Sequence, residues 1–151
     1  MSSGNVSARD GEAVLITPSA LPYETMTAAD LVTLSLDGAV VAGTREPSSE
    51  RRVHLAVYAA RPDARALVHT HSEHATAWSH LGDPLGEVLT ARYAPSGSDE
   101  IAAEAVEALG DREAVLLGRH GVLALGASPA AALEVAAAVE QRARAARRLR
   151  D

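Results

Sequence analysis

The stretch "PSSERRVHLAVYAARPDARALVHTHSEHATAWS", residues 47–79, predicts a helix, a buried strand and a second helix in direct succession. Pro47 and two serines are typical of a helix N-terminus, apolar residues then recur at helical spacing, and Pro62 ends the pattern. Residues 64–71, "ARALVHTH", predict a buried strand, and residues 72–82 predict a helix after it. Because a strand stands between two helices, this stretch favours a layered α/β domain.

The residues before this stretch continue the alternation of helices and strands. Residues 12–19 predict a short buried strand, and residues 27–32 predict a short helix that opens with a capping box. Residues 32–43 alternate apolar and polar side chains around Asp37-Gly38, which predicts a β-hairpin. Hairpins beside interleaved helices favour a mixed sheet.

The residues after it complete one domain. Residues 82–98 are rich in loop-forming residues, and residues 98–110 predict a helix closed by glycine. Residues 113–126 hold two apolar runs around "GRHG", which indicate either a bent strand or a hairpin. Residues 128–150 predict a long terminal helix with proline at its first position. Since no internal repeat or linker is visible, residues 1–151 are expected to form a single domain.

The composition limits the chemistry. Apolar residues make up 47% of the chain, aromatic residues make up 3%, and phenylalanine is absent, so Ala, Val and Leu must build the core. Without cysteine the chain has no disulfide, thiolate nucleophile or cysteine-rich zinc site, which fits a reducing, cytoplasmic setting. All fourteen basic residues are Arg, so the chain cannot form a lysine Schiff base. Any carbonyl chemistry then favours a metal Lewis acid.

Charge and hydropathy exclude two kinds of partner. The formal net charge of −6 argues against non-specific binding of nucleic acid, which needs a basic surface. No apolar run approaches the roughly 20 residues that a membrane-spanning helix needs. The first residues are polar and do not resemble a signal peptide. We therefore expect a soluble protein with no membrane or nucleic-acid partner.

The strand in the opening stretch carries a candidate metal pair. His69 and His71 are two residues apart, so their side chains point to one face of the strand. Two imidazoles at that spacing can converge on one ion at about 2.0–2.1 Å. The alternative is a polar pair on a solvated strand face, but Leu67 and Val68 indicate that the strand is buried.

Two further residues extend the candidate site. His120 lies between the glycines of "GRHG", where the backbone can approach another group closely. Glu50 lies in the first turn of the helix that leads to the His69 strand. It either stabilises the helix dipole, or it acts as a fourth ligand or a general base. Three histidines and a carboxylate form a plausible zinc set that leaves one position for substrate.

The same helix start suggests an anion site. The hydroxyls of Ser48 and Ser49, with the free N–H groups of the first turn, can bind an anion, whereas simple capping needs one serine. Residues 2–9, "SSGNVSAR", predict a Gly-Asn-Val-Ser turn whose backbone N–H groups can bind a phosphate. A phosphate site beside a metal site would suit a small sugar phosphate.

Four ordered motifs resemble the class II aldolase/adducin superfamily. They are "SGNVSAR", "LITPSALPYETMTAADLV", the opening stretch and "LLGRHGVLALG", and they span nearly the whole chain. The likeness is greatest to the L-fuculose-1-phosphate aldolases and L-ribulose-5-phosphate 4-epimerases. It implies a three-layer α/β/α domain with a mixed, largely antiparallel sheet. It also implies a zinc-dependent enzyme that forms a homotetramer with active sites between subunits.

The resemblance assigns roles to residues of this chain. His69, His71 and His120 match the zinc histidines, and Glu50 matches the catalytic base, which also contacts zinc when no substrate is bound. The ion would polarise the substrate's oxygens in place of a Schiff-base lysine, and Glu50 would move the proton at the reacting carbon. Tyr93 is the only candidate for the tyrosine that protonates the aldehyde in a neighbouring subunit. The positions that match phosphate-binding residues are Asn5, Ser19, Ser48 and Ser49.

The resemblance leaves three functions open. An aldolase that cleaves a ketose 1-phosphate to dihydroxyacetone phosphate and an aldehyde is favoured, because Glu50 stands where the epimerases usually carry Asp. "VHTHSEHATAWS" looks more like the epimerases, so a pentulose-5-phosphate 4-epimerase is the alternative. A non-catalytic adducin-like module is disfavoured, since such relatives have lost the zinc histidines.

The chain also departs from the family pattern. It begins almost at the "GNVS" motif, without the family's preceding helix, so we expect a truncated product, a minimal member or a piece whose true start lies upstream. Ala20 stands where the aldolases commonly have glycine. Outside the motif roles, His54 is expected to be a packing or surface residue, and His74 could support the metal ligands.

Overall fold

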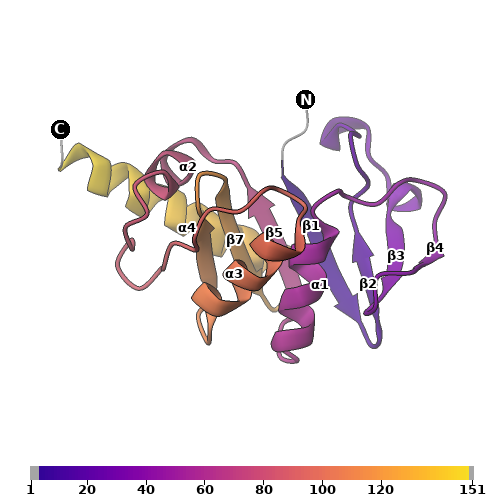
Figure 1. Ribbon diagram of the computed structural model, residues 1–151. Coiled ribbons are helices and arrows are strands. Elements are labelled where there is room, and N and C mark those ends of the chain that lie inside the picture. Colours follow the sequence, from indigo (N-terminus) through magenta and orange to yellow (C-terminus); the bar gives the residue numbers. More distant parts are fainter. Residues whose placement is uncertain (1–3, 150–151) are drawn as a thin grey trace.

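A computed structural model describes residues 4–149 as one antiparallel sheet covered by helices on both faces (Figure 1). The strands are β1 (Asn5–Asp10), β2 (Ala13–Ile16), β3 (Val32–Ser35), β4 (Val40–Ala42), β5 (Ala66–Thr70), β6 (Ala114–Leu117) and β7 (Gly121–Gly126). Their order in the sheet is β4-β3-β2-β1-β5-β7-β6, and each pair of neighbouring strands among these residues is antiparallel. The one parallel contact recorded is the isolated bridge between Thr90 and Leu116.

Helices on both faces make three layers. They are α1 (Arg51–Ala60), α2 (Glu73–Ser79), α3 (Asp99–Leu109) and α4 (Pro129–Arg148), with short 3-10 turns at Tyr23–Thr25 and Ala28–Asp30. Helices α1 and α3 cover one face of the sheet, and α2 and α4 cover the other (Figure 1). The expected three-layer α/β/α domain with a largely antiparallel sheet is therefore confirmed.

The interior strand β5, next to β1 in the sheet, is buried on both faces. Leu67 belongs to the core under α1 and α3, whereas its neighbour Val68 belongs to the core under α2 and α4. Successive side chains of a strand point to opposite faces, so a strand between two helical layers reads as a continuous apolar run. The apolar run "ALV" therefore predicts a buried strand. His69 follows this run, near the end of β5.

Most predicted elements are confirmed. The hairpin around Asp37-Gly38 joins β3 to β4, with Gly38 at φ +93°, and the two apolar runs around "GRHG" form the hairpin β6–β7. The capping box at Thr27 closes a single 3-10 turn, since the backbone N–H of Thr27 donates to Asp30 at 2.9 Å. Arg150, the last residue of the predicted terminal helix, lies outside the described residues.

The predicted Gly-Asn-Val-Ser turn is wrong. Residues Asn5–Asp10 form strand β1, which pairs with both β2 and β5 in the middle of the sheet. Asn5 and Ser7 are buried and alternate with less buried residues, so their polar side chains share the more buried face of β1. Polar residues beside glycine favour a turn by local rules, but here the buried face itself is polar. Residues 2 and 3 of the motif lie outside the described residues.

None of the helices within residues 4–149 combines sufficient length with sufficient apolar character to cross a bilayer.

Candidate metal centre and active site

His69 and His71 extend from the end of β5, as predicted. In the sheet His69 lies opposite Asn5 of β1 on one side and Leu123 of β7 on the other. Its Nδ1 donates to the carbonyl oxygen of Val122 at 2.9 Å, so in the neutral ring the lone pair is on Nε2. That Nε2 lies 2.8 Å from Nε2 of His71. The backbone of β7 therefore fixes which nitrogen of His69 faces the cluster.

His120 reaches the same point from the β6–β7 turn. Its ring centroid lies 4.9 Å from that of His69 and 4.8 Å from that of His71. Arg119 before it has φ +59°, a strained conformation for a residue with a β-carbon. The buried Nε2 of His120 has no hydrogen-bond partner among the described residues, although it approaches Glu50 Oε1 to 2.6 Å. The approach is close, but it lacks the alignment of a hydrogen bond.

Glu50 stands immediately before α1, buried beside the three histidines. Asn5 Nδ2 donates to its Oε2 at 2.7 Å, and the Ser96 hydroxyl donates to its Oε1 at 2.9 Å. Its Oε2 also lies 3.3 Å from Nε2 of His69. Burial alone would raise the pKa of this carboxyl, but contact with His120 and the nearby imidazoles hold the pKa well below its ordinary value. Glu50 is therefore ionised at neutral pH.

The four side chains fit a divalent metal ion. One ligand atom from each of Glu50, His69, His71 and His120 lies within 4.8 Å of the others. Burial lowers the pKa of His69 to about 4 and also lowers that of His71, so both rings are neutral near pH 7, the form that binds metals. Facing imidazole nitrogens and a buried nitrogen without a partner are the features that a cation would satisfy. Three imidazoles and one carboxylate match the donor set that zinc prefers.

A polar groove of about 410 Å³ adjoins the cluster. All four of the predicted phosphate-binding residues line it: Asn5, Ser19, Ser48 and Ser49. Ser48 is already engaged within the loop, because its hydroxyl accepts the backbone N–H of Glu50 at 3.2 Å. Ala20 has φ +57°, a left-handed conformation that favours glycine, at the position where glycine is common in the aldolases. The backbone of this loop thus keeps the glycine conformation at the cost of local strain.

Asn5 lies in the site of its own chain, whereas Tyr93 lies at the surface. Asn5 is buried and bonds to Glu50, so it supports the carboxylate as well as lining the polar groove. The Tyr93 side chain is 61% exposed and packs under the Arg119 guanidinium, 5.5 Å from the ring centroid. Tyr93 is outside the groove beside Glu50 and lines a separate cleft with Ser79 and His80. Within one chain, therefore, Tyr93 is not brought to the cluster.

Sequence reasoning missed two contributions to this site. Ser96 comes from the loop before α3, whose path no local pattern predicts. His54 is fully buried and connects β1 to α1 by hydrogen bonds, so a surface position is wrong and a purely apolar packing role is insufficient. Its position four residues after Glu50, one turn along the same helix face, was the signal that could have found it.

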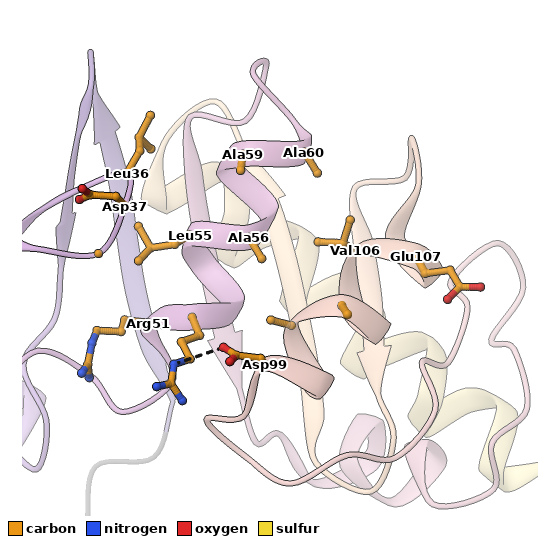
Figure 2. A pocket seen from close by; sticks show the side chains of 14 residues that line it. Leu36, Asp37, Arg51, Leu55, Ala56, Ala59, Ala60, Asp99, Val106 and Glu107 are labelled. Atoms are coloured by element: carbon orange, nitrogen blue, oxygen red, sulfur yellow. Dashed lines mark ion pairs between the residues drawn. The ribbon is translucent and has the colours of Figure 1, made fainter.

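A larger groove of about 920 Å³ lies away from the histidines (Figure 2). It runs between α1, α3 and the β3–β4 turn, with Leu55 and Val106 on its walls and the Arg52–Asp99 ion pair of 3.4 Å at one end. The lining contains no histidine. Groove size alone therefore does not locate the chemistry, which the ionisable cluster marks.

The fold and the cluster define a three-layer α/β protein with a candidate metal centre at the end of the central strands. Residues 1–146 match the family described as Class II Aldolase and Adducin N-terminal domain, and the chain belongs to this family.

Known proteins similar to this chain include aldolases and an epimerase. An L-fuculose phosphate aldolase of Escherichia coli O6:H1 is 39% identical over an alignment of 150 residues that covers 91% of this chain and 69% of the relative. An L-ribulose-5-phosphate 4-epimerase of Salmonella paratyphi B is 51% identical over 81 residues, which are 52% of this chain and 36% of the relative. A solved structure of an L-fuculose 1-phosphate aldolase has a TM-score of 0.89 at 34% identity and covers 94% of this chain and 73% of that one. The class II aldolase fold is thus established for this chain.

Proposed function

We propose that the protein is a zinc-dependent aldolase that reversibly cleaves a small ketose 1-phosphate to dihydroxyacetone phosphate and an aldehyde. The observation that carries this proposal is the cluster of Glu50 with three histidines beside a serine-lined groove. The similarity to an L-fuculose phosphate aldolase across 91% of the chain supports the substrate class.

Different residues are assigned to metal binding, proton transfer and phosphate binding. His69, His71 and His120 would hold the zinc ion, which when bound supplies Lewis-acid stabilisation of charge on the substrate's oxygens. Glu50 is ionised and lies at the wall of the groove, so it can take a proton from the reacting carbon and return it. The phosphate of the substrate is assigned to Asn5, Ser19, Ser48 and Ser49, which line the same groove as Glu50.

The aldehyde oxygen needs a proton donor that the cluster of one chain does not supply. Tyr93 is exposed, as a residue that acts in a neighbouring copy must be. We therefore include in the proposal a cytoplasmic homotetramer with active sites between subunits, in which Tyr93 serves the adjacent chain. Sedimentation analysis of the metal-loaded protein checks the tetramer. An active monomer would contradict this part of the proposal and leave the aldolase reaction intact.

The experiment that tests the reaction is C–C bond formation. Zinc-loaded protein is incubated with dihydroxyacetone phosphate and a panel of small aldehydes, and the condensation products are measured. Glu50→Gln should abolish the reaction because the amide cannot take up a proton. Glu46→Gln is the matched control, since Glu46 is an exposed carboxylate just before the same helix. Full activity of Glu50→Gln would exclude Glu50 as the base.

A pentulose-5-phosphate 4-epimerase is the second candidate. The observation that favours it is the high local identity to the epimerase relative over about half of the chain. Interconversion of pentulose 5-phosphates without cleavage would support the epimerase. No product from either substrate set, in protein that holds zinc, would refute both reactions.

A further inference from the structure

A continuous chain of buried hydrogen bonds leads from the interior of the protein to Glu50. Asn5 Nδ2 lies 2.7 Å from Glu50 Oε2, and Asn5 Oδ1 lies 2.5 Å from Nε2 of His54. His54 Nδ1 lies 2.6 Å from the Ser7 hydroxyl, which in turn lies 2.9 Å from the Tyr58 hydroxyl. His54 and Tyr58 are 0% exposed, and Ser7 and Asn5 are 2% and 4% exposed. Solvent therefore has almost no access to any member.

Chemistry fixes the direction of every bond in this chain. The Glu50 carboxylate only accepts, so the Asn5 amide must turn its NH₂ group to Glu50 and its oxygen to His54. His54 must then donate from Nε2 and accept at Nδ1 from the Ser7 hydroxyl. Ser7 in turn accepts from the Tyr58 hydroxyl. Burial, followed by the neighbouring His69, lowers the pKa of His54 to about 3, which agrees with a neutral ring carrying one proton.

The spacing of polar residues on α1 matches the spacing of polar residues on β1. Glu50, His54 and Tyr58 are four residues apart on or next to α1, and each step of four residues rises about 6 Å. Asn5 and Ser7 are two residues apart on β1, and that step rises about 6.7 Å. Because the two rises nearly agree, the polar side chains of the helix and the strand stay in step. A single line of hydrogen bonds can therefore run between α1 and β1.

The polar line lies beside an apolar core. Tyr58, at its inner end, belongs to the core under α1 and α3 together with Val53, Val57 and Leu67. A buried polar network of this kind contributes little stability over well-packed apolar residues, so its fixed geometry is its main consequence. Here the geometry holds one carboxylate oxygen of Glu50. Two other contacts of that carboxylate come from His69 and His120, the nitrogens of which are assigned to the metal.

We propose that His54 is a positioning residue that, through Asn5, fixes the Glu50 carboxylate for proton transfer. It acts through a fixed tautomer: the proton on Nε2 orients the Asn5 amide, and Ser7 with Tyr58 holds that tautomer. The proposal rests on the proposed function for its effect on catalysis, whereas the tautomer and the orientation of Asn5 do not depend on which reaction the protein performs.

The tautomer is tested first, in the wild-type protein. Long-range ¹H–¹⁵N correlation spectra of the histidine rings should show His54 protonated at Nε2 and unprotonated at Nδ1 between pH 6 and pH 8. A proton on Nδ1, or a doubly protonated ring, would overturn the proposal. This readout needs no substrate. A wild-type protein without aldol activity would overturn the proposed function, and an Nε2-protonated His54 would still support the fixed Glu50 carboxylate.

Substitution then separates positioning from packing. His54→Leu should lower kcat by about 10- to 100-fold, the range for removal of a group that orients a site residue, while KM stays within about twofold. His54→Gln keeps an N–H that can reach Asn5 and should recover part of the loss. Thr76→Val is the control, because it removes a buried hydroxyl without a hydrogen-bond partner among residues 4–149. Activity of His54→Leu equal to that of this control, at equal zinc content, would show a merely structural role.

Discussion

Gly121 and His71 lie so close together that a β-carbon at position 121 would stand 3.1 Å from Cδ2 of the His71 imidazole. The same β-carbon would overlap the carbonyl oxygen of Thr70. The glycine after His120 therefore lets the start of β7 approach the end of β5, where His120 meets His69 and His71. The second glycine of "GRHG" thus permits close packing of the two strands, in addition to the turn that the motif forms.

Gly121→Ala should weaken metal binding at least about tenfold, the lower range for disturbed support of metal ligands, and destabilise the fold by about 1–3 kcal/mol through overpacking. Zinc titration and urea unfolding measure the two effects. Gly11→Ala is the control. A β-carbon at position 11 meets no atom within 4 Å, but the φ of +59° makes the substitution strained at a site outside the cluster. Equal zinc affinity of the two variants would refute the close-approach argument.

Zinc should bind at about one ion per chain, and His69→Ala and His120→Ala should each lose it. Metal analysis of the purified protein and thermal unfolding with and without zinc provide the measurements. His80→Ala is the matched control, since His80 is exposed and outside the cluster. A protein that holds no metal and is not stabilised by zinc would contradict the enzyme hypothesis altogether.

Two serines of one loop should separate activity from stability. Ser96→Ala removes the hydroxyl that donates to Glu50 at 2.9 Å and should lower kcat/KM by about tenfold, equivalent to about 1.4 kcal/mol. Ser98→Ala removes the N-cap of α3, where the hydroxyl accepts the N–H of Ile101, and should cost about 1 kcal/mol of folding stability. Enzyme kinetics and urea unfolding of both variants form the test. The reverse assignment of effects would contradict the role of Ser96.

Glu140 of α4 forms hydrogen bonds with the start of α2, the helix that follows β5. Its carboxylate accepts the backbone N–H groups of His74 and Ala75 at 2.9 and 2.7 Å. Glu140→Gln leaves only one acceptor oxygen and should destabilise the protein by about 1–2 kcal/mol, measured by urea unfolding. Glu134→Gln, an exposed substitution on the same helix, is expected to change stability by less than about 0.5 kcal/mol. No difference between the two would exclude the capping role.

The metal-free protein should lose stability in mild acid, partly through His54. Its pKa in the folded protein is about 3, below the ordinary 6.5, so between these values the unfolded chain binds the proton and the folded chain does not. Stability therefore falls as the pH drops below about 6.5. Between pH 7 and pH 5 the wild type should lose about 1–2 kcal/mol more than His54→Gln. Urea unfolding with a chelator at both pH values checks this, and equal losses would contradict it.

The local elements were accessible from the sequence because their signals are local. The period of Val53 and Val57, the dipeptide Asp37-Gly38 and the apolar run before His69 each depend on neighbours a few residues apart. The turn predicted at residues 4–7 is wrong because the burial of these residues depends on distant parts of the chain. Asn5 and Ser7 are polar because they contact Glu50 and His54, residues 45 and 47 positions away, and no local rule contains that information.

The sequence by itself determined most of the helices and strands, the histidine pair at the end of β5 and, through four ordered motifs, the family. The resemblance implied that Glu50 and His120 join this pair, and the fold brings the four side chains together. Only the tertiary structure decided that Ser96 reaches Glu50 from a loop and that His54 is buried in a polar line behind it. The physical reason is range. Periodicity and capping act within a few residues, whereas a site of converging side chains exists only after β1, β5 and β7 pair and α1 packs against them.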